Sequence, residues 1–234
     1  GEEAGRLNEV FVKYISTGIP FTAMKIAMTL DGKIATRTGA SRWVATLPAL
    51  RFAHHLRNVY DSILVGVGTV LIDNPRLDVR RVQKIKDPIR IILDTFARTP
   101  LSANVLKIQG AKTIIAVGPE ASPKKIAALA KKGAQVIPVP AKAGYIDLKS
   151  LMKQLAEMQI TSVLLEGGGE VNASFIKAGL VDKAYFDIVP KIFGGREAKT
   201  PVEGDGVLFP SQAKWLHAVH VERLDRDILV SGYF

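Results

Sequence analysis

Cysteine is absent from this 234-residue sequence. Its absence excludes disulfide bonds, thiolate catalysis and every zinc site built on cysteine. Long apolar runs are missing too, because Lys13 and Lys25 interrupt the early hydrophobic segments and nothing approaches the length of a membrane span. No signal-peptide pattern is present either. The sequence therefore predicts a soluble, cytoplasmic protein with no membrane partner.

Acidic residues are scarce relative to basic ones: 22 Asp and Glu against 32 Lys and Arg give a formal net charge of +10. Such a surplus favours an anionic partner, either nucleic acid or a small phosphorylated molecule. The basic residues form no stripe interleaved with aromatic residues, and pairs such as Lys124-Lys125 are typical of the solvated face of a helix. We therefore expect a phosphorylated small molecule and no nucleic-acid partner.

Apolar periodicity alternates between the strand and helix patterns along most of the chain. This alternation predicts one α/β domain with a mostly parallel central sheet and helices on both faces. Segments 215–224 and 227–234 predict an antiparallel hairpin that closes the sheet. The other strands are expected at 21–29, 62–68, 89–94, 112–117, 134–139 and 162–166, and helices at 7–16, 47–59, 69–73, 123–132, 147–159 and 170–179.

Glycine-rich and polar motifs follow four of these predicted strands: LDGK at 30–33, GVGTVLIDNP at 66–75, LDT at 93–95 and LLEGGG at 164–169. Ligands of open parallel sheets bind at the carboxyl ends of the strands. The sequence therefore predicts a binding site at that edge.

The stretch LLEGGGEVN ends a predicted strand with Glu166 and the triplet Gly167–Gly169. It is not a P-loop, because no Gly-Lys-Ser/Thr follows, and Asn172 stands where a dinucleotide fingerprint needs its third glycine. Two interpretations are open from these residues: a tight turn into the next helix, or a backbone cradle for a phosphate at the helix N-terminus.

Lys25 lies on the first predicted strand in an apolar setting, so its ammonium needs a partner. The adjacent histidines His54 and His55 fall on one helix and point in different directions. They cannot easily face one ligand, and we interpret them as structural. No metal site is expected.

In order and spacing, six motifs make the chain similar to the reductase domain of riboflavin biosynthesis, a family related in fold to dihydrofolate reductase. The resemblance covers nearly the whole chain. It rests on KIAMTLDGKIAT (25–36), SRWV (41–44), LRNVYDSILVGVGTVLIDNPRLDVR (56–80), RIILDT (90–95), LLEGGGEVN (164–172) and PKIFGG (190–195).

The resemblance implies an NADPH-dependent oxidoreductase. It would reduce the ribosyl group of 5-amino-6-(5-phosphoribosylamino)uracil to the ribitylamino product, with hydride going to C1′ of the ring-opened imine. Archaeal and fungal relatives reduce 2,5-diamino-6-(ribosylamino)-4(3H)-pyrimidinone 5′-phosphate instead, and the same motifs suit both substrates. A dihydrofolate reductase-like enzyme for another pterin or pyrimidine, or a non-catalytic nucleotide-binding module, are the remaining alternatives.

The resemblance also implies residue roles. It makes the glycine triplet the cradle for the NADPH pyrophosphate, and it makes Arg57 and Arg80 a clamp on the substrate 5′-phosphate, which guanidinium groups match in geometry. Catalytic roles are implied for Lys25, Asp73 and Glu166. Cofactor contacts are implied for Ala27, Trp43, Thr69, Asp73, Thr95, Gly167, Gly168 and Gly169, and substrate contacts for Ser41, Arg57, Leu77, Arg80 and Glu166.

The lead-in EEAGRLNEVFVKYISTGIPF (2–21) resembles the connector that follows the deaminase domain of the bacterial bifunctional enzyme. The zinc pattern of that deaminase, His-x-Glu with Pro-Cys-x-x-Cys, is not in the sequence. We expect residues 1–20 to form a helical connector and residues 21–234 the reductase domain. A covalently linked deaminase domain outside this chain is an expected partner, and the family implies a homodimer.

Overall fold

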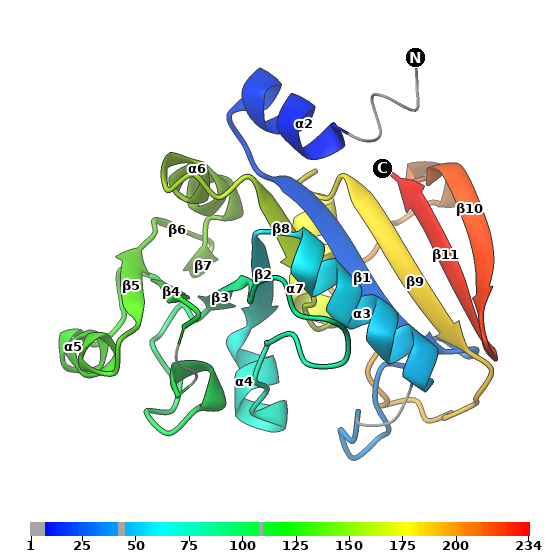
Figure 1. Cartoon of the computed structure of the whole chain (residues 1–234), viewed down its shortest axis with the longest axis horizontal. Coiled ribbons are helices and arrows are strands. Elements are labelled where there is room, and N and C mark those ends of the chain that lie inside the picture. Colours follow the sequence, from blue (N-terminus) through cyan, green and yellow to red (C-terminus); the bar gives the residue numbers. More distant parts are fainter. Residues whose placement is uncertain (1–7, 42–44, 108–109) are drawn as a thin grey trace.

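The structure is a computed structural model that describes residues 8–41, 45–107 and 110–234. Within these ranges one large sheet organises the fold (Figure 1). Its strands are β1 (Phe21–Thr29), β2 (Ser62–Gly66), β3 (Ile89–Leu93), β4 (Thr113–Val117), β5 (Gln135–Pro138), β8 (Ser162–Leu165), β9 (Lys183–Val189), β10 (His217–Leu224) and β11 (Asp227–Tyr233). The helices are α2 (Glu9–Thr17), α3 (Leu47–Val59), α4 (Val67–Asp73), α5 (Pro123–Lys131), α6 (Leu148–Glu157) and α7 (Gly169–Lys177).

The sheet runs in the order β10-β11-β9-β1-β8-β2-β3-β4-β5. Every pairing from β9 to β5 is parallel, whereas β11 lies antiparallel to β9 and β10 antiparallel to β11. The predicted mostly parallel sheet and its antiparallel C-terminal hairpin are therefore confirmed. The first strand lies in the middle of the sheet, because β8 and β9 return from the end of the chain to flank it.

Alternation along the strands divides the core between the two faces of the sheet. On one face Met24 and Ile26 of β1 pack with residues of α6 and α7, among them Leu151 and Phe175. On the other face Phe21, Ala23 and Leu164 pack against α3, which lies across β1 in Figure 1. The helices α4 and α5 cover that same second face over β2, β3 and β4. Helices on both faces were expected, and the structure confirms this arrangement.

The segment 62–68 departs from its prediction as a single strand. β2 ends at Gly66, and Val67 already belongs to α4. A Cβ on Gly66 would lie 2.9 Å from the side chain of Val171 in α7, so α4 and α7 begin close together. The chain turns into a helix at the sheet edge, which apolar periodicity could not reveal because Val65 and Val67 are both buried.

The strand β9 and four smaller elements were not predicted. The strands β6 (Ala141–Lys142) and β7 (Tyr145–Ile146) pair as a short hairpin between β5 and α6. Short 3₁₀ turns occur at η1 (Asn104–Leu106) and η2 (Pro210–Gln212). In the lead-in, α2 covers the described part of the expected helix, while the division into connector and reductase domain stays a prediction.

Candidate active site

The carboxyl ends of β1, β8, β2 and β3 meet at one edge of the sheet, and the four predicted motifs follow them there. The carboxylate of Asp31 joins the LDGK motif to PKIFGG, since it accepts hydrogen bonds from the amides of Phe193 and Gly194 at 3.1 and 2.7 Å. The hydrogen bond from Thr29, helped by these amides, lowers the pKa of Asp31 to about 2. The predicted convergence of motifs is therefore confirmed.

Glu166 is the first residue after β8, and it forms an ion pair with Arg57 of α3. Arg57 Nε and Nη2 donate to the two carboxylate oxygens at 3.0 and 2.7 Å, and Arg57 Nη1 donates to the carbonyl of Asp78 at 3.2 Å. The two side chains are only 12% and 17% exposed. Bidentate guanidinium–carboxylate pairs are geometrically specific, so Arg57 fixes the orientation of Glu166.

Burial alone would raise the pKa of Glu166, but the Arg57 guanidinium outweighs it and holds that pKa below its usual range. Lys25 and His54 act in the same direction. Burial alone would lower the pKa of Arg57, and the Glu166 carboxylate holds it above its usual range instead. Both groups are therefore charged at neutral pH, and each compensates the other.

Asp78 forms hydrogen bonds with three arginines. Its carbonyl binds Arg57, and its carboxylate accepts hydrogen bonds from Arg80 Nη1 and, at 2.8 Å, from Arg76 Nε. His54 Nδ1 accepts a hydrogen bond of 3.4 Å from the Arg80 amide. Burial, with Arg57 and Arg80 nearby, lowers the pKa of His54 to about 4, so this imidazole is neutral. The two arginines expected to clamp phosphate both contact Asp78, Arg57 at its carbonyl and Arg80 at its carboxylate, but Arg57 is already paired with Glu166.

Lys25 and Ala27 lie on the face of β1 that α3 covers. Both are half-buried. Within the described residues Lys25 makes no hydrogen bond or ion pair, yet its ammonium favours the ionised form of both Glu166 and Asp187. Ala27 is the register partner of Asp187 in β9. Lys25 therefore acts electrostatically on one carboxylate that is paired and on one that is not.

The three predicted glycines differ in what surrounds them. A Cβ on Gly167 would meet Asn172 Oδ1 and Val171 at 2.9 Å, and one on Gly169 would meet Glu203 and the Thr200 carbonyl at 2.5 Å. These two positions need glycine because the protein itself packs against them. A Cβ on Gly168 would meet nothing within 4 Å, and its φ of −75° suits any residue.

Gly168 is the N-cap of α7, and among the described residues no side chain caps that helix. In this part of the chain neither packing nor backbone conformation requires glycine at position 168. The open space in front of its α-carbon, at the N-terminus of a helix, suits an anionic ligand that approaches the backbone closely.

Ser41 and Asp73, which come from separate motifs, meet at this edge: Ser41 Oγ donates to Asp73 Oδ1 at 3.0 Å. Asp73 ends α4, and Thr69 lies one turn earlier on the same helix. The residue after the helix, Asn74, has a left-handed backbone with φ of 42°. Ser41, a predicted substrate contact, is therefore hydrogen-bonded to Asp73, a predicted cofactor contact.

Thr95 follows β3 and packs closely against β4, where a Cβ on Gly118 would lie 2.9 Å from its methyl group. Leu77 is buried and adopts a φ of 53°, a left-handed conformation that is uncommon for a branched side chain. Such a position persists only where the surrounding structure determines it, and it presents the backbone of the loop before Asp78 in a fixed direction.

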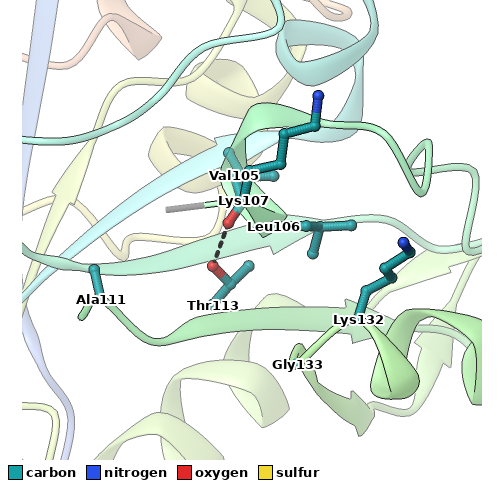
Figure 2. A pocket seen from close by; sticks show the side chains of 7 residues that line it. All are labelled: Val105, Leu106, Lys107, Ala111, Thr113, Lys132 and Gly133. Carbon is teal, nitrogen blue, oxygen red and sulfur yellow. Dashed lines mark hydrogen bonds between the residues drawn. The ribbon is translucent and has the colours of Figure 1, made fainter. Parts of the chain in front are cut away.

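Trp43 lies outside the described residues, so its expected cofactor contact stays a prediction. Among the described residues, no group of three or more histidine, aspartate or glutamate side chains could hold a metal ion. A pocket lies elsewhere, between η1, the start of β4 and the turn before β5, and none of the predicted site residues contributes to it (Figure 2). Its lining consists of Val105, Leu106, Lys107, Ala111, Thr113, Lys132 and Gly133.

Sequence reasoning missed two residues of this edge. Asp78 stands inside the motif PRLDVR between two predicted contacts, and its flanking arginines were the signal that could have found it. Asp187 interrupts an otherwise apolar strand, AYFDIV, and a charged residue in such a run is a comparable signal.

We compared the sequence with known protein families and proteins. The family model of the RibD C-terminal domain matches residues 20–230. A riboflavin biosynthesis protein RibD of Actinobacillus pleuropneumoniae is 40% identical over 98% of this chain, and a 2,5-diamino-6-ribosylamino-4(3H)-pyrimidinone 5′-phosphate reductase of Methanothermobacter thermautotrophicus is 40% identical over 90%. The chain spans 61% of the first protein and 96% of the second.

Solved structures agree. The crystal structure of a diaminohydroxyphosphoribosylaminopyrimidine deaminase/5-amino-6-(5-phosphoribosylamino)uracil reductase of Thermotoga maritima is 32% identical, superposes with a TM-score of 0.80, and covers 99% of this chain, which spans 61% of it. Dihydrofolate reductase of Enterococcus faecalis, at 14% identity and a TM-score of 0.50 over 91% of this chain and 96% of its own, shares the fold alone.

The predicted dihydrofolate reductase-like fold is therefore confirmed. In the described residues no helix is both long enough and apolar enough to cross a membrane. The family match covers most of the sequence, and the motifs that carry it meet at the carboxyl edge of the sheet. The chain belongs to the family of RibD C-terminal domains.

Proposed function

We propose that this chain reduces the ribosyl group of 5-amino-6-(5-phosphoribosylamino)uracil to the ribitylamino product with NADPH. The observation that carries the proposal is the Arg57–Glu166 pair beside Lys25, at the same sheet edge as the open glycine Gly168. The uracil substrate is favoured because the lead-in resembles the connector of bifunctional enzymes, and the Thermotoga maritima relative names that activity.

The diamino-pyrimidinone is the second candidate substrate. One specific observation favours it: the Methanothermobacter relative, which bears that name, is matched over 96% of its length. The RibD protein of Actinobacillus pleuropneumoniae is matched over 61% of its length.

NADPH fits the residues present. The open approach at Gly168, next to the uncapped start of α7, suits the pyrophosphate, because free amides and the helix dipole favour anions. Thr69, Asp73 and Thr95 would contact the cofactor from α4 and the end of β3, and Ala27 from β1. Trp43 would pack on it. Bound NADPH supplies a hydride, and the chain supplies binding, orientation and exclusion of water.

The substrate would lie between Glu166 and the arginines. Glu166, held by Arg57, accepts hydrogen bonds from ribose hydroxyls or the pyrimidine. Arg80, with a side chain 47% exposed, is the arginine more accessible to the 5′-phosphate. Ser41 and the backbone at Leu77 complete this surface. Lys25 would give a proton to the atom next to the carbon that is reduced.

The decisive assay follows NADPH oxidation with the uracil and the diamino-pyrimidinone substrates side by side. Turnover of the uracil compound at the higher kcat/KM supports the proposal, and preference for the diamino compound selects the second candidate. Lack of turnover with either one by folded protein contradicts both. A parallel calorimetric titration with NADPH alone separates a failure of binding from a failure of chemistry.

We also propose that the protein is cytoplasmic and forms a homodimer. We further propose that a deaminase domain is covalently linked to this chain. Support comes from β10, which ends the sheet and is exposed along nearly its whole length. Unpaired edges of this kind invite another chain. Val219 and Val221 are 53% and 59% exposed on it.

Light scattering of the Val219→Asp variant tests this surface. We expect loss of the dimer, because a charge desolvated at an interface is costly. The matched control is Val59→Asp, a valine equally exposed at 53% on α3. A dimer that survives Val219→Asp excludes the β10 surface.

A further inference from the structure

Asp187 lies on β9 beside the predicted reaction centre. Its register partners are Ala27 on one side and Leu229 of β11 on the other. Side chains of register partners point to the same face of a sheet. Asp187 therefore shares with Lys25 and Ala27 the face that α3 covers. It is fully buried, and neither carboxylate oxygen has a hydrogen-bond partner in the described structure.

An unpaired buried carboxylate is costly, so its surroundings decide its state. From β1 the ammonium of Lys25 favours the ionised form, and from β11 the carboxylate of Asp227 opposes it. Asp227 is occupied by α3, since its Oδ2 accepts from the amide and hydroxyl of Thr46 at 2.8 and 2.6 Å. Burial is the strongest influence, and it raises the pKa of Asp187 to about 6.

The other charged groups of this face are committed elsewhere. The α3 residues Arg57 and His54 interact with Glu166, and Tyr185 of β9 packs edge-on against Phe52. Lys25 is the cation that acts on Asp187, and Glu166 already has its own cation. The Lys25 ammonium thus lies in the field of two carboxylates, and among the described residues Asp187 is the one of the two without a hydrogen-bond partner.

We propose that Asp187 is a positioning residue that acts through Lys25: it shares a face of the sheet with the Lys25 side chain, no ion pair joins the two groups among the described residues, and it returns the proton that Lys25 gives up during the reaction. This inference rests on the proposed reductase function. Reduction of the imine consumes one hydride and one proton. C1′ gains the hydride as the nicotinamide is oxidised, the C=N electron pair moves to nitrogen, and nitrogen takes a proton from Lys25.

The proton is then replaced internally. The O–H bond of protonated Asp187 breaks as the N–H bond of Lys25 re-forms, which leaves an ammonium beside a carboxylate. Solvent protonates Asp187 again before the next turnover. Proton transfer therefore slows as pH rises through the titration of Asp187.

The first test needs no substrate. Carboxyl ¹³C signals of labelled aspartate are followed by NMR against pH, and the Asp187 signal is identified by its loss in Asp187→Asn. We expect titration near pH 6, as burial dictates, and a shift to higher pH in Lys25→Met because the favouring cation is gone. Titration at the ordinary value of 3.8, or a midpoint that Lys25→Met leaves unchanged, overturns the coupling.

The second test is the pH profile of kcat. Asp187→Asn should lower kcat roughly tenfold to a hundredfold, at the modest end of acid–base effects, and abolish the decline near pH 6. The NADPH dissociation constant should not change. Asp182→Asn is the matched control, with the same substitution just before β9, and it should keep the wild-type profile. A wild-type profile in Asp187→Asn overturns the proposal.

The two failures can be told apart. Wild-type protein that binds NADPH but reduces neither substrate overturns the reductase function, and with it the catalytic role of Asp187. Normal turnover combined with an unchanged Asp187→Asn profile overturns the role of Asp187 alone.

Discussion

The two ends of β9 carry aspartates that the structure treats in opposite ways. At the amino end, Asp182 accepts from Lys13 Nζ at 2.7 Å and from the Thr22 amide at 2.8 Å, so both oxygens are used. Five residues on, Asp187 is fully buried with neither oxygen bonded in the described structure. The first aspartate ties the lead-in helix to the sheet, whereas the second has no structural role of that kind.

A similar contrast separates Asp61, where β2 begins, from Glu166, where β8 ends. Asp61 accepts from the amide and hydroxyl of Thr161 and from Lys86, all ordinary structural partners. Among the described residues Glu166 accepts hydrogen bonds from Arg57, and both side chains are mostly buried. A buried charged group that one ion pair holds is a candidate for binding or reaction. Asp61 therefore has the contacts of a structural residue, and Glu166 those of a site residue.

Breaking the Arg57–Glu166 pair should give the largest effect. Arg57→Met leaves the Glu166 carboxylate buried without its partner, and we expect unfolding in urea to become easier by about 3–5 kcal/mol. The double variant Arg57→Met/Glu166→Gln should recover much of that loss, because it removes the uncompensated charge. A single variant as stable as the wild type would show that the pair is effectively solvated.

Asp187→Asn should sharpen the contrast within β9 by increasing stability. Because burial raises the pKa of Asp187 from 3.8 to about 6, the folded protein binds this proton more tightly than the unfolded chain. Stability from this group is present below about pH 4 and is lost as pH rises through 6. The variant should therefore be more stable than wild type by about 1–3 kcal/mol at pH 8, with no gain at pH 4.

Urea midpoints of the two proteins at both pH values provide the measurement. Their difference isolates Asp187 from other titrating groups such as His54. Asp182→Asn serves again as the control, and it should lose stability at pH 8 because its carboxylate is bonded. An Asp187→Asn variant less stable than wild type at pH 8 would contradict the unpaired state of this carboxylate.

Gly168→Val tests the open side of the cradle. Since a Cβ there meets nothing and φ is −75°, folding should be unaffected, while NADPH binding should weaken by about tenfold or more, roughly 1.4 kcal/mol. Calorimetry measures the binding. Gly169→Val is the contrasting variant, and it should destabilise the fold because its Cβ would lie 2.5 Å from Glu203 and Thr200. Unchanged NADPH affinity in folded Gly168→Val supports the plain-turn interpretation.

Ser41→Ala should have the smallest effect on stability. It removes one partly exposed hydrogen bond to Asp73, and we expect a loss of about 0.5–1.5 kcal/mol or less. Turnover should fall more than stability does, because Asp73 loses the group that orients it. Urea unfolding and kcat, measured on the same preparation, give the two numbers. Equal wild-type kcat would leave Ser41 with a structural role only.

Much of the fold could be read from the sequence because its signals are local. Examples are the period-two alternation in β1, the proline in the first turn of α3 and apolar runs such as SVLL. Such patterns predict a helix or a strand without any knowledge of the segments that pack against it. Strand order was not readable, since β8 and β9 flank β1 from more than a hundred residues away. No local pattern encodes such pairings.

The site divides in the same way. The sequence by itself determined which polar and glycine-rich motifs follow strands, and hence that they meet at one edge, because parallel strands share a direction. Only the tertiary structure decided that Arg57 pairs with Glu166, that Gly168 alone among the three glycines faces open space, and that Asp187 lies unpaired in the same electrostatic field as Lys25. Each of these features depends on which side chains meet when segments that are distant in the sequence pack together. The burial and the neighbours of a side chain then determine its charge state, which residue type alone does not.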